Sequence, residues 1–339
     1  MLAAVFVEPG KPLELRELQD PEPGRGEVIL KIERCGICAT DLHLTEPGFA
    51  MPTGFIAGHE RGAIVAAVGA GVERLKVGDH VVPHSAKGCG RCDKCTAGTP
   101  FLCSQMAMNM GGFAKFMACP EFVCVKMPTQ MPFADSALVE PLAVGLLGIE
   151  RNPFPIGAKV AVLGVGPVGL AAIFWARRAG AGKIVALASS RAKEALALAV
   201  GANHFLTTGE GIAGEVAELL SGPPDVVLEC AGAPGAIELC VDLVKPQGSV
   251  TVYGLCTHAD HWHPANALLK EVKLQFVVST SLQQFRIAAD VLDAGAVEPR
   301  MMVSETVSLA QLPETFEQMR AGMGHRCKVM VDPWLEAAR

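Results

Sequence analysis

The sequence predicts an α/β protein with two parts, a β domain and a doubly wound parallel sheet. Its 339 residues exceed what one hydrophobic core usually needs and suit two domains. Up to about residue 130 the chain is rich in Gly and Pro, with short β-branched runs between turn signals. From about residue 155 apolar strand-like runs alternate with amphipathic helical patterns. That alternation is typical of a parallel sheet covered by helices on both faces.

The β domain is expected from short runs that end at turn residues. The clearest are EVILKIER (27–34), GAIVAAVGAGV (62–72) and DHVVPHSA (79–86). Because turns separate strands this short, we expect a compact domain that carries long loops.

The second half is predicted to contain five parallel strands. They are KVAVLG (159–164), KIVALA (183–188), DVVLEC (225–230), SVTVYG (249–254) and KLQFVV (273–278). Helical patterns lie between them, for example RAKEALALAVG (191–201). The tail is expected to form a helix over 285–295, a second helix near Pro313 to Ala321, and a last strand, KVMVDP (328–333).

Composition excludes several classes of protein. With 50% hydrophobic and 19% charged residues the chain has no signature of disorder, and its net charge of -6 gives no reason to expect nucleic acid. The first residues lack a basic region and reach Glu8 too early for a secretory signal. The apolar run Val160 to Ala176 is interrupted by Gly and Pro, so a buried strand and helix fit better than a membrane span. We expect a soluble, cytoplasmic protein without membrane or nucleic-acid partners.

Four of the twelve cysteines form the strongest local motif, CGRCDKC followed by a fourth cysteine. Two-residue gaps let a turn direct successive sulfurs to one centre, and four thiolates close a tetrahedral zinc completely. The sequence therefore predicts a structural Zn²⁺ on Cys89, Cys92, Cys95 and Cys103. A chance group of buried thiols and an iron–sulfur cluster are the alternatives.

A glycine-rich turn, GVGPVG, follows the strand KVAVL and opens a helix. In this context Gly164 permits the tight turn, Gly166 lets the backbone approach a pyrophosphate, and Gly169 allows the helix to pack on the strand. Pro167 and Val168 complete the turn, whose helix N-terminus faces the phosphates. The motif predicts a dinucleotide site on a Rossmann domain.

A third group lies in CGICATDLH and GHE. Cys38, His59 and Glu60 can ligate a second metal, while Thr40 and His43 supply a hydroxyl and an imidazole nearby. Each residue alone fits an ordinary core or loop position. Together with a hydride-carrying cofactor they indicate an open zinc site, with three protein ligands and one position for water or substrate.

These motifs together give the chain a recognisable pattern. CGICATDLH, GHE, VGDHVV, the four-cysteine lobe, GGFA, VEPLAVG and VLGVGPVG occur in the order found in zinc-containing medium-chain alcohol dehydrogenases. The chain resembles that family over essentially its whole length, and most closely the sorbitol and threonine dehydrogenase branch. The resemblance implies a GroES-like catalytic domain (1–147 and 286–339) with a Rossmann domain (148–285) inserted in it.

The resemblance also implies roles for individual residues. Catalytic zinc is expected on Cys38 and His59, with Glu60 as a direct or exchanging ligand. Glu140 of VEPLAVG falls where many members place the remaining ligand, so Glu60 binds, or Glu140 binds, or one of them holds the zinc-bound water. Asp41 matches the acid that orients the ligating histidine.

The implied reaction is reversible hydride transfer between an alcohol and a nicotinamide cofactor, with zinc polarising the substrate oxygen. Thr40 accepts the hydroxyl proton, and the family's route continues through the nicotinamide ribose to a histidine at the position of His43. An NAD(P)-dependent alcohol dehydrogenase with about two zinc ions per chain is therefore expected.

The substrate expectation depends on residues that differ from the polyol dehydrogenases. The Arg-Tyr pair that binds sugar hydroxyls there is replaced by Thr280 and Ser281. We therefore expect a hydrophobic or aromatic alcohol, aldehyde or ketone, with apolar surface offered by Phe49, Met51, Phe55, Met106 and Met108. The alternatives are an NAD-dependent polyol dehydrogenase, a zinc-free reductase of the same fold, and a non-catalytic zinc or redox-sensing protein.

The end of the second Rossmann strand predicts the choice of nucleotide. Ala188 stands where an acid would hold the ribose hydroxyls of NAD and repel a 2′-phosphate. Ser189, Ser190 and Arg191 offer donors and a positive charge suited to that phosphate, so we expect a preference for NADP. Either serine can also cap the following helix. A homodimer or homotetramer is expected, joined through the apolar runs near 249–256 and 273–278.

Overall fold

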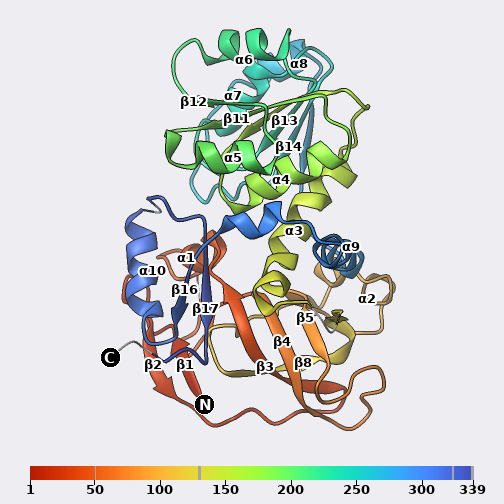
Figure 1. Cartoon of the computed structure of the whole chain (residues 1–339), viewed down its shortest axis with the longest axis vertical. Coiled ribbons are helices and arrows are strands. Elements are labelled where there is room, and N and C mark those ends of the chain that lie inside the picture. Colours follow the sequence, from red (N-terminus) through yellow and green to blue (C-terminus); the bar gives the residue numbers. More distant parts are fainter. Residues whose placement is uncertain (50, 129–130, 323, 337–339) are drawn as a thin grey trace. The chain divides into compact units, whose positions relative to one another are not determined.

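The computed structural model describes residues 1–49, 51–128, 131–322 and 324–336 (Figure 1). The chain divides into two compact units, one formed by Met1–Ala143 with Ser279–Arg339 and the other by Val144–Val278. The helix α3 (Phe133–Arg151) contains the passage from the first unit to the second. Each unit has its own sheet and its own hydrophobic core.

The first unit is built on a seven-stranded sheet in the order β16-β17-β3-β4-β5-β9, with β8 paired to β3. Its central strand β3 (Glu27–Gly36) buries Val28, Leu30 and Ile32 completely, which is the two-residue period of a strand with one face on a core. The other strands of this unit are β1 (Leu2–Val5), β2 (Glu14–Glu17), β4 (Glu60–Val68), β5 (His80–Pro83), β6 (Ala86–Lys87), β7 (Ala107–Met108), β8 (Phe116–Pro120), β9 (Cys124–Lys126), β16 (Val303–Ser308) and β17 (Lys328–Asp332).

Short helices lie in the loops of this unit, and longer ones follow in the tail. They are α1 (Ala39–Leu44), α2 (Asp93–Thr96), α9 (Leu282–Asp293) and α10 (Leu312–Ala321), with 3-10 turns η1 (Pro100–Leu102), η2 (Glu121–Val123) and η4 (Glu298–Met302). Helix α9 begins with a capping box in which Ser281 and Gln284 satisfy each other's backbone N–H groups. The two helices and last strand expected in the tail are confirmed.

The second unit is a six-stranded, all-parallel sheet in the order β12-β11-β10-β13-β14-β15. Its strands are β10 (Lys159–Leu163), β11 (Lys183–Ala188), β12 (His204–Thr207), β13 (Val226–Glu229), β14 (Ser249–Val252) and β15 (Lys273–Phe276). The five expected strands are confirmed, and β12 is additional. This strand escaped prediction because only Phe205 of its four residues is buried, too short a pattern to show alternation.

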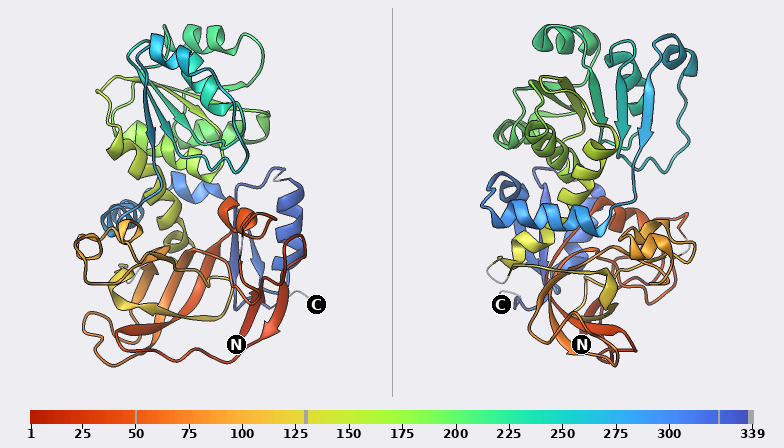
Figure 2. Two further views of the ribbon diagram at one scale, coloured as in Figure 1. Left: turned by 180° about the vertical axis from the view of Figure 1, so that it is seen from behind. Right: turned by 90° about the vertical axis from the view of Figure 1, so that its right-hand side faces the viewer.

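Helices cover both faces of the parallel sheet, as the alternating pattern predicts (Figure 2). They are α4 (Pro167–Arg178), η3 (Arg191–Lys193), α5 (Glu194–Val200), α6 (Ile212–Leu220), α7 (Ala236–Leu243) and α8 (Pro264–Leu269). Helix α4 packs with α5, and α6 packs with α7. The end of α3 joins this packing: a side chain at Gly145 would meet the backbone of Ala171 at 2.8 Å, and Gly145 O accepts from the hydroxyl of Tyr253. Glycine is therefore required where α3 crosses α4.

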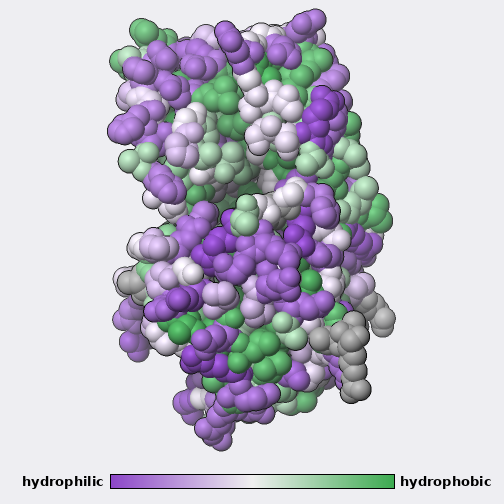
Figure 3. All heavy atoms as spheres, turned by 90° about the vertical axis from the view of Figure 1, so that its left-hand side faces the viewer, coloured by the Kyte–Doolittle hydropathy of each residue, from purple (hydrophilic) through white to green (hydrophobic). Residues whose placement is uncertain are grey.

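On the face drawn in Figure 3, apolar and hydrophilic side chains are both exposed, and the hydrophilic ones are densest in the lower half of the view. Among the described residues, no helix combines the length and hydropathy that a membrane span requires. None of the twelve cysteines, all of which lie among the described residues, forms a disulfide. The sulfur chemistry of the chain is therefore that of thiols and of metal ligands.

Candidate active site

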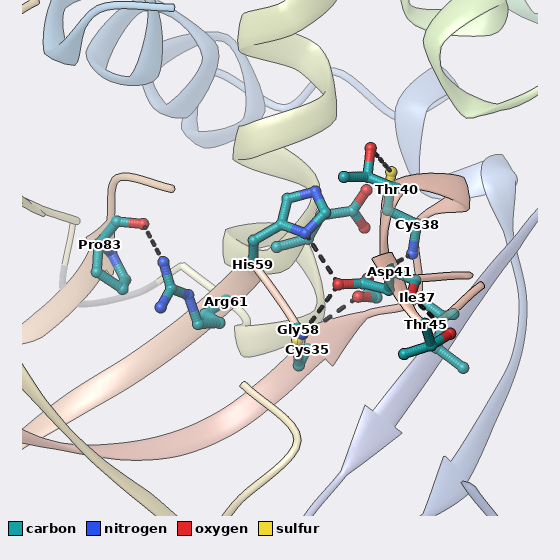
Figure 4. Close-up of polar contacts among 12 residues, drawn as sticks. Cys35, Ile37, Cys38, Thr40, Asp41, Thr45, Gly58, His59, Arg61 and Pro83 are labelled. Atoms are coloured by element: carbon teal, nitrogen blue, oxygen red, sulfur yellow. Dashed lines mark hydrogen bonds and ion pairs between the residues drawn. The ribbon is translucent and has the colours of Figure 1, made fainter. Parts of the chain in front are cut away.

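A tight turn after β3 places the first candidate ligand. Cys38 is the N-cap of α1, and its backbone N–H donates to Asp41 Oδ2 at 3.0 Å. Asp41 is completely buried, and its other oxygen accepts from the N–H of Gly58 at 2.9 Å. One carboxylate therefore joins the start of α1 to the loop that precedes β4 (Figure 4).

The same oxygen of Asp41 lies 3.1 Å from His59 Nδ1, which leaves the other ring nitrogen free for a ligand. The contact that the sequence predicted between Asp41 and His59 is thus present (Figure 4). Burial lowers the pKa of His59, but the Asp41 carboxylate and the Cys38 thiol outweigh it, so this pKa lies well above its usual range. Burial raises the pKa of Asp41, but His59 and the two backbone N–H groups lower it overall.

Cys38, His59 and Glu60 form a group whose potential ligand atoms all lie within 4.8 Å of one another. A thiolate, an imidazole and a carboxylate are a donor set that suits Zn²⁺ and leaves a position open, so the residues fit a catalytic zinc. Thr40 Oγ1 lies 3.7 Å from Cys38 Sγ, at the edge of this group. His43 follows one turn later on α1 and pairs with Glu46 Oε2 at 3.3 Å, with about 30% of its side chain exposed.

Glu60 also forms a buried ion pair that the sequence did not predict. Lys328 Nζ lies 2.6 and 2.5 Å from its two carboxylate oxygens and also donates to Ile37 O. A side chain at Gly36 would meet Glu60 Oε2 at 1.9 Å, so only glycine leaves room for this pair. Glu60 thus has both oxygens engaged by a buried ammonium while it lies within ligand distance of Cys38 and His59.

Glu140 lies on α3, immediately before Pro141, and only 6% of it is exposed. Burial raises the pKa of Glu140 to about 7; His59 and Lys328 oppose the rise, whereas Glu60 and Asp41 add to it. Glu140 therefore interacts electrostatically with the charged residues of the candidate site. Among the described residues, the group whose ligand atoms lie within 4.8 Å of one another does not include Glu140.

The four-cysteine lobe brings its sulfurs together as the spacing predicts. The ligand atoms of Cys89, Cys92, Cys95 and Cys103 lie within 4.8 Å of one another. Cys92 and Cys103 have their sulfurs 3.7 Å apart, close to the roughly 3.8 Å that two sulfurs at 2.3 Å from a tetrahedral zinc would show. The donor set and spacing therefore fit a closed, structural zinc.

Backbone N–H groups favour the thiolate form at two of the four cysteines, Cys89 and Cys103. Cys103 Sγ accepts from the N–H groups of Cys89 and Gln105 at 3.4 and 3.3 Å. Hydrogen bonds from the backbone of Arg91 and Cys92 lower the pKa of Cys89 to about 6. A side chain at Gly88 would meet Cys95 Sγ at 2.6 Å, so glycine is needed for the loop to fold around the sulfurs.

The glycine-rich turn of the second unit connects β10 to α4, and its three glycines differ in their surroundings. Gly164 has a φ of +96°, and a side chain there would meet the backbone of Cys230 and Ala231 at 2.7 Å. A side chain at Gly169 would meet Gly164 O at 1.9 Å. Gly166 is the N-cap of α4, and nothing lies within 4 Å of where its side chain would be. Backbone atoms therefore pack against the turn at Gly164 and Gly169, whereas there is open space at Gly166, directly before the helix. Pro167 and Val168 are the first two residues of α4.

The end of β11 exposes the residues expected near the nucleotide ribose. Ser189, Ser190 and Arg191 are exposed, and Ser190 is the N-cap of η3 without a capping bond from its side chain. Its hydroxyl is thus not used for the cap. Arg191 donates from Nε to Glu194 Oε2 at 2.7 Å and pairs with the other oxygen through Nη2. The guanidinium is therefore already held by a neighbouring carboxylate.

The positions considered for substrate recognition have other structural roles. Thr280 is only 1% exposed, and its hydroxyl lies 3.1 Å from His84 Nε2, while Ser281 caps α9. Phe55 and Met108 line a shallow groove of about 350 Å³ whose lining does not include Cys38, His59, Glu60 or Glu140. Met51 packs against the core of the first unit and Met106 is exposed. None of these observations connects these residues to the candidate zinc ligands.

Both parts of the chain match known family models. Residues 24–129 match the alcohol dehydrogenase GroES-like domain, and residues 167–294 match the zinc-binding dehydrogenase domain. A D-xylulose reductase A from Aspergillus terreus is 30% identical over 91% of this chain and 90% of its own length. Human sorbitol dehydrogenase is 28% identical over 98% of this chain and 96% of its own.

A solved structure shows the same similarity to dehydrogenases. A zinc-binding dehydrogenase from Sinorhizobium meliloti, bound to NADP, superimposes with a TM-score of 0.88 at 30% identity, over 98% of this chain and 99% of that one. Fold, donor groups and comparisons together define a zinc-dependent, NAD(P)-dependent dehydrogenase. The chain belongs to the zinc-containing medium-chain alcohol dehydrogenase family.

Proposed function

We propose that this dehydrogenase reversibly oxidises a secondary hydroxyl of a polyol or vicinal diol, with NADP as the preferred acceptor. The observation that carries the substrate class is the similarity to sorbitol and D-xylulose enzymes along nearly the whole of both chains. It favours the polyol alternative over the hydrophobic alcohol that the sequence motifs suggested.

A hydrophobic alcohol was expected because no arginine stands at Thr280 and Ser281. Thr280 is buried against His84 and Ser281 caps a helix, so both side chains have partners within the fold. The similarity to sorbitol and D-xylulose enzymes therefore carries the proposed substrate class.

For the zinc sites we propose that Cys38 and His59 hold the catalytic ion and that Glu60 or Glu140 completes its protein ligands. The lobe of Cys89, Cys92, Cys95 and Cys103 holds the structural ion, giving about two zinc ions per chain. The catalytic ion supplies Lewis acidity toward the substrate oxygen. Asp41 fixes the orientation of His59 through the 3.1 Å contact.

Thr40, whose hydroxyl lies beside Cys38, is proposed to accept the proton of the substrate hydroxyl while it passes its own hydroxyl proton on toward His43. His43 lies one turn further along α1 and is partly exposed, so it can pass a proton to solvent. The hydride acceptor is proposed to lie on the turn of Gly164, Gly166, Pro167, Val168 and Gly169, with Ser189, Ser190 and Arg191 toward the 2′-phosphate. This gives the catalytic role to the first unit and the dinucleotide role to the second.

Two further features belong to this proposal. The edge strand β15 exposes Phe276 (61%) and is followed by exposed Val278 (75%), which supports a homodimer or homotetramer joined at that edge. Twelve cysteines without a disulfide support a reducing compartment such as the cytoplasm. The molar masses of wild type and Phe276→Lys, measured by light scattering, test the proposed interface at β15. An unchanged oligomer in Phe276→Lys would contradict this interface.

Kinetics on a substrate panel test the substrate and nucleotide together. We expect sorbitol, xylitol or 2,3-butanediol to give a higher kcat/KM than hexanol or benzyl alcohol, and NADP a higher value than NAD. The reverse order among the alcohols would contradict the polyol class. An unchanged KM for NADP in Arg191→Ala would contradict the part given to that arginine.

A further inference from the structure

A buried glutamate stands at the end of β13, where the order of the parallel strands reverses. From β10 the chain runs outward through β11 and β12, and it returns on the other side of β10 as β13. In sheets of this kind the ligand lies in the crevice at the carboxyl ends of the strands on either side of that reversal. Glu229 is the last residue of β13, and only 1% of it is exposed.

The carboxylate of Glu229 joins two loops. Its Oε1 accepts from the backbone N–H groups of Ala231 at 2.7 Å and Gly232 at 2.8 Å, in the loop after β13. Its Oε2 accepts from the N–H of Gly254 at 3.2 Å, in the loop after β14. A carboxylate is the one side-chain group of this size that accepts on two oxygens and donates on neither. Glu229 therefore bridges the ends of two neighbouring strands.

The loops that Glu229 bridges are in direct contact, because glycines form the contact. A side chain at Gly254 would meet Gly232 N at 2.3 Å and Glu229 Oε2 at 2.4 Å. Gly232 has a φ of +62°, and a side chain there would meet the backbone of Leu255 at 2.9 Å. On its other side the loop after β13 packs on Gly164 of the glycine-rich turn. The glycine-rich turn and the two loops thus form one packed edge.

We propose that Glu229 is a positioning residue for the nicotinamide half of the dinucleotide. The two halves of such a sheet each take one mononucleotide. The half formed by β10, β11 and β12 carries the glycine-rich turn and the Ser189–Arg191 segment, so it takes the adenosine half. The loops after β13 and β14 belong to the other half, and they are the loops that Glu229 holds. This inference rests on the proposed nucleotide site.

Glu229→Gln tests the proposal with little change in size. An amide has one acceptor oxygen, so one of the two loops loses its acceptor and faces an N–H donor instead. We expect the Kd of NADPH, measured by fluorescence, to rise by about tenfold, the loss expected for one hydrogen bond to a charged group. The Kd of 2′,5′-ADP, which carries only the adenosine half, should change by less than about twofold.

A matched control separates positioning from general loss of stability. Asn152 is 4% exposed and bonds the hydroxyls of Ser249 and Thr251 on β14, at 2.9 Å each. Asn152→Ala should lower the melting temperature and leave the ratio of the two Kd values unchanged. Glu229→Asp keeps the charge but is one methylene shorter, so it should show the same differential loss as Glu229→Gln.

The outcomes distinguish this inference from the site on which it rests. If wild-type protein binds neither NADPH nor 2′,5′-ADP, the proposed nucleotide site is wrong. If it binds both, and the Glu229 variants weaken the two ligands equally or weaken neither, the positioning role is wrong. Selective loss of NADPH affinity in both Glu229 variants, together with no such loss in Asn152→Ala, supports it.

Discussion

Lys328 Nζ lies 2.5 Å from Glu60 Oε2, across a sequence separation of 268 residues. Lys328 is completely buried and Glu60 is 1% exposed, so each charge depends on the other for compensation. Lys328 opens β17, the last strand, and Glu60 opens β4 next to His59. The tail of the chain therefore supplies the positive charge that compensates the buried Glu60 carboxylate.

Removing the charge of Lys328 should destabilise the folded protein. In Lys328→Met the Glu60 carboxylate stays buried without its partner, and we expect a loss of roughly 3–5 kcal/mol in the free energy of unfolding. Urea denaturation measures it. The double variant Lys328→Met with Glu60→Gln should recover a large part of the loss, since no buried charge is then left alone.

A surface pair offers the matched control for this measurement. Arg16 pairs with Glu14, with 41% and 55% of the two side chains exposed. Arg16→Met should change stability by less than about 1 kcal/mol. Equal losses in Lys328→Met and Arg16→Met would contradict the role given to the buried pair.

The stability of the first unit should fall in mild acid because of His84. Burial lowers the pKa of His84 to about 4, below the ordinary value of 6.5, although its contacts with Ala86 and Thr280 oppose this. The folded state therefore binds this proton less readily than the unfolded state does. Above about pH 6.5 His84 is neutral in both states and does not lower the free energy of unfolding. As the pH falls toward 4, that free energy falls by about 3 kcal/mol in all.

Unfolding measured between pH 4 and pH 7 checks this. His84→Gln cannot take up the proton, so it should show a smaller loss of stability over that range while being less stable than wild type at pH 7. Because acid also releases zinc from thiolates, zinc content is measured on the same samples. Parallel pH profiles for the two proteins at equal zinc content would refute the assignment.

Loss of one sulfur from the four-cysteine lobe should remove one zinc ion and lower stability. Cys103 is the best position to change, since its sulfur accepts two backbone hydrogen bonds and lies 3.7 Å from that of Cys92. In Cys103→Ser we expect zinc content to fall by about one per chain, with a lower melting temperature. Cys240→Ser, at a buried thiol of the second unit, is the control and should keep all its zinc. Iron in place of zinc would indicate the cluster alternative.

Nucleotide preference should respond to Glu194 as well as to Arg191. The Glu194 carboxylate holds the Arg191 guanidinium that is proposed to meet a 2′-phosphate. In Glu194→Gln the competing charge is gone, so the KM for NADP should fall by roughly two- to fivefold, the range expected for an exposed ion pair. The KM for NAD should stay the same. A rise in the KM for NADP would show that the carboxylate supports the site.

Local motifs made much of the molecule predictable. The cysteine lobe spans residues 89–103 and the glycine-rich turn spans residues 164–169, so in both the atoms that meet are close in sequence. Strand β11 was predicted with its observed ends because the apolar run IVALA follows Lys183 and stops at Ser189. The partner of His59 was predictable because Asp41 lies in the CGICATDLH motif beside Cys38.

Long-range electrostatics were not predictable in this way. Lys328 gives one weak signal, a lysine that opens an apolar strand in RCKVMVDP, and nothing in the sequence connects it to Glu60. In the sequence Glu229 is only a polar residue near the end of DVVLEC. The two loops that it bridges become apparent only in the structure. Thr280 was taken for a substrate position because its buried contact with His84 joins residues 196 positions apart.

Zinc content measured together with turnover tests the central claim most directly. Wild-type protein should contain about two zinc ions per chain and oxidise sorbitol, xylitol or 2,3-butanediol. Cys38→Ser should keep about one ion, in the cysteine lobe, and lose turnover by several orders of magnitude while remaining folded. Wild-type turnover without zinc, or Cys38→Ser with full zinc and full turnover, would contradict a catalytic zinc at Cys38 and His59.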